Sequence, residues 1–213
     1  MAIYDSNTNR MTIFGGQNGA LQGGALVDTW VLTNADGTGG TPQWMQLTTS
    51  GSAPAWPYGS SGVYDSENNI LIVFGGSSGE GGDYTSLVWT LSNANGEGGT
   101  PNWTQLTTSG GPPAQRAFHV AVYDQAHNIM TIFGGSNQSG ELQDTWILSN
   151  ANGIGGTPTW TLLNISDSKP SAREAHTAAY DPINNIMMMF GGDTGGLDGW
   201  FVTPWILTHA NGQ

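Results

Sequence analysis

Short apolar runs that end in a pair of glycines recur at an even interval along the chain. In one copy, residues 129–133 are almost continuously apolar and stop at Gly134-Gly135. The four glycine pairs begin at Gly15, Gly75, Gly134 and Gly191, at spacings of 60, 59 and 57 residues. An even period of this length is typical of tandem repeats whose units pack on one another.

Each period divides into four segments of strand length. In the third copy they cover residues 120–123, 129–133, 145–148 and 160–163. The second is apolar on both faces, whereas the last two alternate apolar and polar residues. Asp and Asn residues follow the first segment, and they tolerate the left-handed backbone of a hairpin turn. Gly or Pro interrupts most windows that could form a helix. The pattern predicts an all-β chain of four-stranded antiparallel blades, the pattern of a β-propeller.

Two further signals keep the same phase as the glycine pairs. A Tyr-Asp pair precedes each glycine pair, and tryptophans follow in two registers: Tyr4-Asp5, Tyr64-Asp65, Tyr123-Asp124 and Tyr180-Asp181; Trp30, Trp89, Trp146 and Trp205; Trp44, Trp103 and Trp160. Over nearly the whole chain this frame resembles kelch repeats, specifically the longer bacterial kind found in galactose oxidase. The resemblance implies inner first strands, outer fourth strands, and one face that carries the glycine-pair loops and the blade connections. In kelch proteins that face commonly binds the partner.

The repeat predicts a single domain over residues 1–213, with blades over about 1–50, 51–110, 111–166 and 167–213. The fourth blade lacks its outer strand, since the chain stops where that strand is due. We expect the first tryptophan register to be buried between blades. We also expect that the chain is not a lone closed ring: it is a segment of a larger propeller, or it self-associates, most simply as a two-fold pair sharing eight blades.

Composition excludes several classes of partner and site. The formal charge is −12, from 16 acidic and 4 basic residues, which disfavours nucleic acid and anionic membranes. The apolar runs are too short to span a bilayer, so no membrane insertion is expected. No signal peptide is expected in this chain, because the repeat begins at Met1, and few Lys with many Asn, Thr and Gly favour a bacterial secreted or cell-surface protein. The absence of Cys excludes disulfides and the cysteine-linked tyrosine of galactose oxidase.

Basic residues recur at the blade connections. Arg116 and His119 reappear as Arg173 and His176 in the next blade. Matched positions favour structural roles, with carboxylate or acidic-sugar binding by the arginines as the alternative. A metal site built on the two histidines would need further ligands. The repeated Asp residues mark turns rather than a catalytic pair, and no calcium-loop spacing occurs. No catalytic residue, metal or cofactor is therefore predicted, with calcium kept as a minor alternative.

Aromatic residues interrupt the repeat where the loops differ. Trp56 and Tyr58 replace the arginine-containing segment before the second blade, and Tyr84 stands in an otherwise small, polar loop. The last glycine-pair loop carries Asp198, Trp200 and Phe201. Exposed aromatics beside polar side chains are typical of sugar-stacking or peptide-anchoring surfaces, and packing over the rim or against a missing blade is the alternative.

These features favour a non-enzymatic binding module that presents its loops to a protein or peptide. A carbohydrate-binding, lectin-like propeller is the second hypothesis. Part of a kelch-type oxidase or sugar epimerase is the third. The candidate ligand-binding residues are Trp56, Tyr58, Tyr84, Arg116, His119, Arg173, His176, Asp198, Trp200 and Phe201.

Overall fold

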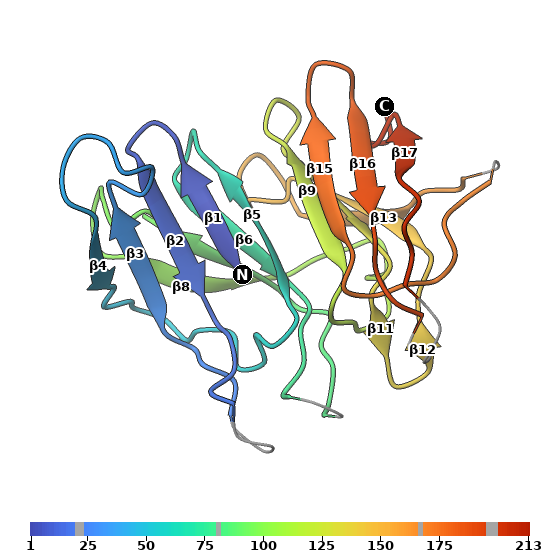
Figure 1. Ribbon diagram of the computed structural model, residues 1–213, viewed down its shortest axis with the longest axis horizontal. Coiled ribbons are helices and arrows are strands. Elements are labelled where there is room, and N and C mark those ends of the chain that lie inside the picture. The colour runs from blue at the N-terminus through green and yellow to red at the C-terminus, as the bar shows by residue number, and fades with distance from the viewer. Residues whose placement is uncertain (20–23, 80–81, 166–167, 195–199) are drawn as a thin grey trace.

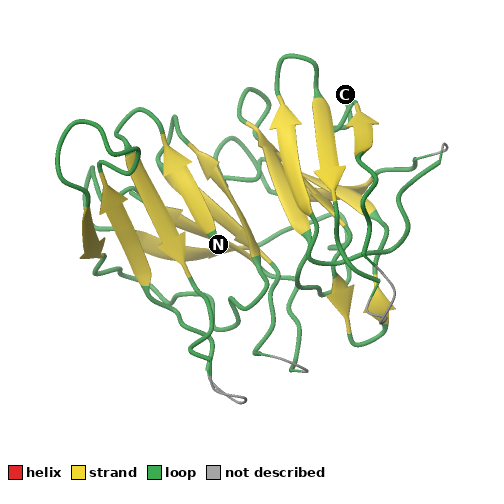
Figure 2. Ribbon diagram, viewed as in Figure 1, coloured by secondary structure: helices red, strands yellow, loops and turns green. Residues whose placement is uncertain are grey.

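The computed structural model describes residues 1–19, 24–79, 82–165, 168–194 and 200–213. All regular elements in these ranges are strands (Figures 1 and 2). Nothing in these ranges forms a helix that is long and apolar enough to cross a membrane. The all-β prediction is confirmed.

Among the described residues, the longer strands form four antiparallel sheets in which chain order equals spatial order. Blade one contains β1 (Ala2–Asp5), β2 (Arg10–Phe14), β3 (Thr29–Thr33) and β4 (Gln43–Gln46); blade two contains β5 (Ser61–Asp65), β6 (Ile70–Phe74), β7 (Val88–Ser92) and β8 (Asn102–Leu106); blade three contains β9 (Val120–Asp124), β10 (Ile129–Phe133), β13 (Thr145–Ser149) and β14 (Thr159–Leu162); blade four contains β15 (Thr177–Asp181), β16 (Ile186–Phe190) and β17 (Trp205–Thr208). A small hairpin, β11 (Ser136–Asn137) and β12 (Gly140–Glu141), lies in a loop of blade three. The prediction of four antiparallel blades, with three strands in the last, is confirmed.

The turn between the first two strands of each blade is fixed by its Asp and Asn. Asp124 Oδ1 accepts hydrogen bonds from the backbone N–H groups of Ala126 and His127 at 3.1 and 3.3 Å. Asn128 then adopts a positive φ of 53°. Asn tolerates this conformation better than most residues, which is why the hairpin prediction is correct.

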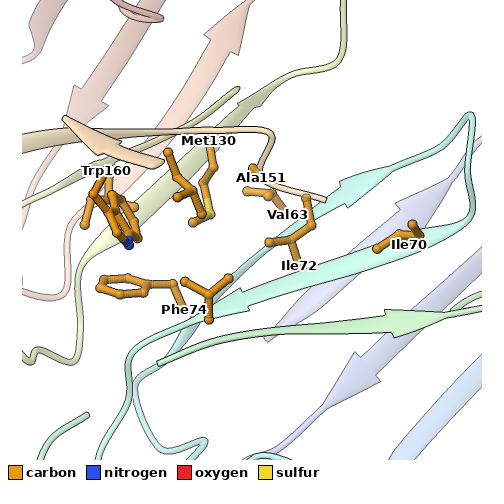
Figure 3. Close-up of a cluster of buried hydrophobic side chains, with 10 residues drawn as sticks. Val63, Ile70, Ile72, Phe74, Met130, Ala151 and Trp160 are labelled. Atoms are coloured by element: carbon orange, nitrogen blue, oxygen red, sulfur yellow. The ribbon is translucent and has the colours of Figure 1, made fainter. Parts of the chain in front are cut away.

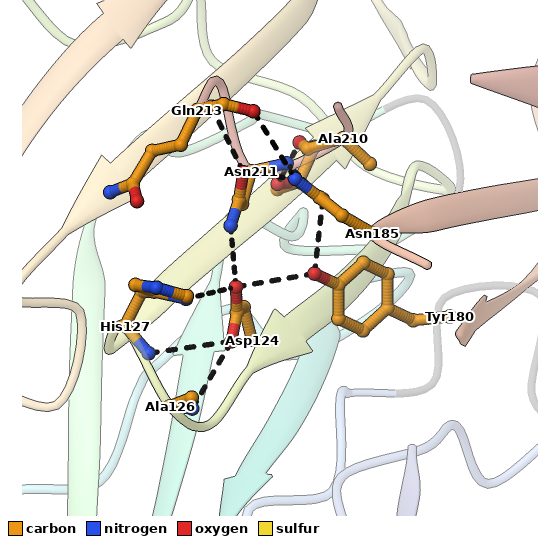
Figure 4. A network of polar contacts seen from close by, with 9 residues as sticks. Asp124, Ala126, His127, Tyr180, Asn185, Ala210, Asn211 and Gln213 are labelled. Carbon is orange, nitrogen blue, oxygen red and sulfur yellow. Dashed lines mark hydrogen bonds and ion pairs between the residues drawn. The ribbon is translucent and has the colours of Figure 1, made fainter. Parts of the chain in front are cut away.

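The same Asp also joins neighbouring blades (Figure 4). Asp124 Oδ2 accepts hydrogen bonds from Asn211 Nδ2 at 2.6 Å and from the Tyr180 hydroxyl at 3.2 Å, both in blade four. Burial raises the pKa of Asp124, but the hydrogen bonds from Asn211 and His127 outweigh this and hold the pKa below its usual value. The repeated Asp therefore serves both the turn and the contact between blades.

The apolar core lies between the blades. Strands β6 and β10 are buried along their whole length. Phe74 of blade two contacts the Trp160 ring of blade three with centroids 4.8 Å apart, beside Ile72 and Met130 (Figure 3). Because one sheet cannot bury both of its faces alone, each blade depends on its neighbours for stability.

The prediction that the first tryptophan register packs between blades is confirmed for Trp89, Trp146 and Trp205, which pack against the apolar clusters between blades. These three side chains and Trp30 are partly buried. The indoles of Trp30 and Trp146 donate to Asp28 and Asp144, both at 2.7 Å, which keeps them near the loop end of their blades. The fourth-strand tryptophans Trp103 and Trp160 are buried more completely, since each packs on a Phe of the preceding blade.

The inner strands β1, β5, β9 and β15 are neighbours in that order, so blades one and four form the ends of an arc (Figure 1). Strand β1 buries only alternate residues, and β16 exposes alternate residues, unlike β6 and β10. Each end blade therefore leaves one apolar face uncovered among the described residues.

Candidate functional site

The glycine-pair loops and the blade connections meet on one face, the lower side of Figure 1, where β11 and β12 lie. Gly76 N–H donates to Arg116 O at 2.8 Å, and Gly135 N–H donates to Arg173 O at 2.9 Å. A Cβ on Gly76 would lie 2.1 Å from Trp56 O, so only glycine fits there. The glycine pairs thus let each loop approach the next connection closely, as the repeat frame implies.

This face carries a hollow of about 440 Å³ between blades two, three and four. Its walls are Tyr58, Gly79, Tyr84, Phe118, Ser136, Asn137, Glu141, Glu174 and Ala175. Tyr58 and Phe118 meet edge to face, with ring centroids 5.2 Å apart. The Glu174 carboxylate accepts a short hydrogen bond from the Ser136 hydroxyl. The hollow combines three aromatic rings with two carboxylates, and none of its lining residues is basic.

Phe118 holds an unusual backbone conformation at this site. Its φ is 57°, a region that bulky residues rarely adopt. Gly59 and Ala175, at the equivalent places in the neighbouring connections, have φ values of 66° and 53°. Hydrogen bonds link the three: Phe118 N–H donates to Gly59 O at 2.6 Å, and Ala175 N–H donates to Phe118 O at 2.9 Å. The repeat imposes the conformation, and Phe118 places a ring at the hollow at the cost of local strain.

The two predicted arginines are buried and do not line the hollow. Arg116 makes a bidentate ion pair with Asp144, at 2.7 and 2.9 Å, and donates to Gly134 O at 3.0 Å. Arg173 donates to Gly191 O at 2.9 Å. Because both side chains hold glycine-pair turns, their contacts favour the structural interpretation over direct ligand binding.

The two predicted histidines are also buried. His119 Nε2 lies 2.6 Å from the Ser61 hydroxyl, and its ring meets Phe74 edge to face. Burial, reinforced by Arg116, lowers the pKa of His119 to about 3. Burial and Arg173 lower the pKa of His176 to about 4. Both imidazoles are therefore neutral at pH 7, and neither reaches the surface of the hollow. Within the described ranges, no three His, Asp or Glu residues lie close enough to hold a metal ion.

The remaining aromatic candidates are dispersed. Trp56 lines a separate hollow of about 180 Å³ with Leu87 and Trp89. The Phe201 ring lies 3.8 Å below the Arg173 guanidinium, a cation–π contact that gives this ring a packing role. Trp200 is 77% exposed but is not part of the hollow. Asp198 lies outside the described residues.

Sequence reasoning therefore found Tyr58 and Tyr84 and missed Phe118, Glu141 and Glu174. A signal for two of the missed residues was present. Phe118 and Glu174 are the variable positions inside the repeated Arg-x-x-His segments at 116–119 and 173–176. Non-repeated residues inside a repeated frame are the places where a shared scaffold can carry a specific site.

Comparisons with known proteins agree with this architecture. A family model described as the KLHDC2/KLHL20/DRC7 Kelch-repeats domain matches residues 1–201. Adagio protein 3 of Arabidopsis thaliana is 30% identical over 186 residues, which cover 86% of this chain and 27% of that protein. Adagio-like protein 3 of Oryza sativa subsp. japonica is 30% identical over 195 residues, which cover 90% and 28%. The chain thus spans little more than a quarter of the length of these relatives.

A solved structure titled "Structure of YjhT" superposes with a TM-score of 0.60 over 90% of this chain and 57% of that one. At 14% identity this likeness supports the fold alone. Because both named relatives are plant proteins, the expectation of a specifically bacterial kind of repeat is not supported.

Proposed function

Since the chain belongs to the kelch-repeat family, we propose that it is a non-enzymatic binding module that holds a protein or peptide on the face carrying the glycine-pair loops. Kelch-repeat propellers are typical protein-interaction modules. The observation that carries the proposal is the hollow on this face, where three consecutive blades contribute side chains that the repeat does not require. A pocket of convergent aromatic and polar groups is the usual form of a recognition site.

The lining favours a peptide that presents a Lys or Arg side chain. Tyr58, Tyr84 and Phe118 offer aromatic faces, and Glu141 and Glu174 offer carboxylates. A cation gains from both, through cation–π contact and charge-assisted hydrogen bonds. The formal charge of −12 would also speed the encounter with a basic partner.

A displayed library of random linear peptides, selected on the immobilised chain, tests the proposal. We expect enriched peptides to share a Lys or Arg, and their binding to weaken about tenfold or more with Tyr84→Ala or Glu141→Gln. Glu141→Gln keeps the shape of the side chain and the backbone pairing with Ser136. Ile183→Ala is the matched control, because Ile183 is exposed in a hairpin turn on the opposite face. Enriched peptides that bind both hollow variants as tightly as the parent would place the site elsewhere.

Carbohydrate binding is the second candidate, because aromatic rings beside carboxylate and amide groups also suit a sugar. Asn137 supplies the amide in this hollow. A glycan array screened with the parent chain and with Tyr84→Ala distinguishes the two functions. Binding of a defined glycan that is lost in Tyr84→Ala, without any enriched peptide, would replace the peptide proposal with a lectin-like one.

A further inference from the structure

In blade three the repeat holds a guanidinium between the blade connection and the glycine pair. Arg116 Nε donates to Ala114 O at 3.0 Å, and Arg116 Nη1 donates to Gly134 O at 3.0 Å. Asp144 adds a bidentate ion pair at 2.7 and 2.9 Å. The forked guanidinium thus satisfies two backbone carbonyls and one carboxylate at the same time.

Blade four shows that this site holds a guanidinium without the carboxylate. Arg173 Nε donates to Ser171 O at 3.1 Å, and its Nη1 donates to Gly191 O at 2.9 Å. Thr203 stands at the position of the acid, two residues before the strand tryptophan. No described carboxylate forms an ion pair with Arg173, which is only 1% exposed. The Phe201 ring, 3.8 Å from the guanidinium carbon, contacts the cation instead. Two carbonyls and an aromatic ring are therefore enough.

Blade two keeps the walls of this site but lacks its arginine. Pro57 stands at the arginine position. Leu87 stands at the position of the acid, because Gly75 N–H donates to Leu87 O at 3.2 Å, the bond that Gly134 and Asp144 make in blade three. A space of about 180 Å³ remains, which we call the Trp56 pocket; its walls include Ala55, Trp56, Gly75, Leu87 and Trp89.

The Trp56 pocket offers the same acceptors as the two occupied sites. By their distances from the Tyr-Asp and glycine pairs, Ala55 and Gly75 are the counterparts of Ala114 and Gly134. Among the described residues, none donates a hydrogen bond to Ala55 O or Gly75 O. An aliphatic occupant would cover these carbonyls without supplying a donor, which is costly. Trp56, which is 37% exposed, supplies an aromatic ring at the mouth of the pocket.

We propose that the Trp56 pocket binds an arginine side chain of the partner, which takes the place that Arg116 and Arg173 occupy in the next two blades. The guanidinium would donate to Ala55 O and Gly75 O and contact the Trp56 ring. A lysine ammonium lacks the fork that reaches two carbonyls at once. The formal charge of −12 also favours a cationic ligand.

This pocket is a second anchor beside the hollow that Tyr58 and Tyr84 line. Trp56 and Tyr58 lie on the same connection and border different cavities, so one bound segment can reach both. The inference rests on the proposed function for the source of the arginine, a protein or peptide partner. Binding of a guanidinium in the Trp56 pocket does not depend on the hollow.

A titration of the isotope-labelled chain with Nα-acetylarginine methylamide, followed by the indole N–H signals of Trp56 and Trp89, tests the inference. We expect both signals to move along a saturating curve, with a dissociation constant at least about tenfold lower than for the lysine and norleucine derivatives. The described lining residues of the hollow include no Trp, so arginine bound there leaves these signals in place. Unmoved signals up to about 50 mM, or an equal response to either other derivative, would overturn the inference.

Two variants test the match to the occupied sites. Leu87→Asp restores the acid at a side chain that is 42% exposed, and it should tighten binding of the arginine derivative about tenfold or more. Pro57→Arg combined with Leu87→Asp should fill the pocket from within and abolish the indole shifts. If that double variant fails to fold, Trp56→Ala, measured through Trp89, should weaken binding at least about threefold. Ile183→Ala is the control. Unchanged binding in Leu87→Asp would overturn the assignment.

The outcome is separable from that of the peptide selection. Selected peptides that bind at the hollow while the arginine derivative leaves both indole signals unmoved would overturn this inference alone. An arginine response at Trp56 and Trp89 without any selected peptide would support the pocket and count against the peptide partner.

Discussion

Mild acid should destabilise this protein before most of its carboxylates are protonated. His119 and His176 have pKa values of about 3 and 4 in the folded chain, because both imidazoles are buried. The unfolded value is about 6.5. Since the folded pKa values are the lower ones, the unfolded chain binds more protons as the pH falls below 6.5. The stabilisation is complete above that pH and is lost as the pH falls towards the folded values.

The size of this loss follows from the two pKa differences. Between pH 7 and pH 4.5, each buried imidazole removes about 2.5 kcal/mol from the free energy of unfolding, or about 5 kcal/mol for both. Domains of this kind are stable by about 5 to 15 kcal/mol, so the loss is a large share of the total. The interval ends at pH 4.5 because aspartates with lowered pKa values, Asp65 and Asp124 among them, add their own losses at more acidic pH.

Urea unfolding followed by tryptophan fluorescence at the two pH values measures this loss. His119→Gln and His176→Gln should each reduce the loss by about half, whatever their stability at pH 7. Thr131→Val is the control: it removes a buried hydrogen bond of 2.7 Å to Ala210 O and should lower stability equally at both pH values. If the double histidine variant lost as much stability as the parent between pH 7 and pH 4.5, the buried imidazoles would not be the cause.

Three further predictions concern backbone and hydrogen-bond constraints. Gly76→Ala should lower the free energy of unfolding by more than about 2 kcal/mol, because its Cβ would lie 2.1 Å from Trp56 O; Gly19→Ala, which meets no atom within 4 Å, should cost clearly less in the same urea titration. Asn152→Ala should cost about 2 to 3 kcal/mol by leaving the buried Asp65 without its 2.6 Å donor, and a thermal melt within about 0.5 kcal/mol of the parent would contradict this. Phe118→Gly should change stability by no more than about 1 kcal/mol, since Gly59 has the same backbone conformation in blade two, yet it should abolish binding of selected peptides.

The sequence predicts the fold well because its signals are local. The hairpin turns follow from Asp and Asn at fixed distances, and the strand ends follow from the glycine pairs. Which tryptophan register is buried more deeply could not be predicted in the same way, because both registers lie in strands with similar alternation. Contact with the preceding blade decides between them: Trp103 meets Phe14, which is 89 residues away in sequence.

The candidate site was less predictable for a related reason. Tyr58, Phe118 and Glu174 are about 60 residues apart in sequence and meet only because consecutive blades align their connections. The sequence favoured a structural role for Arg116 and left ligand binding as the alternative; in the structure, Asp144 and the carbonyl of Gly134 accept hydrogen bonds from its guanidinium. Even in a sequence with few basic residues, a basic residue can be buried in a structural role.

Hydrogen–deuterium exchange of the chain with and without a selected peptide tests the central claim most directly. The account predicts slower exchange in the connection at residues 116–119 and in the loop at residues 136–142, which border the hollow. The hairpin turns at residues 66–69 and 125–128, on the opposite face, should exchange as in the free chain. Protection confined to those turns or to the outer strands, with no change around the hollow, would contradict the claim that the glycine-pair face holds the partner.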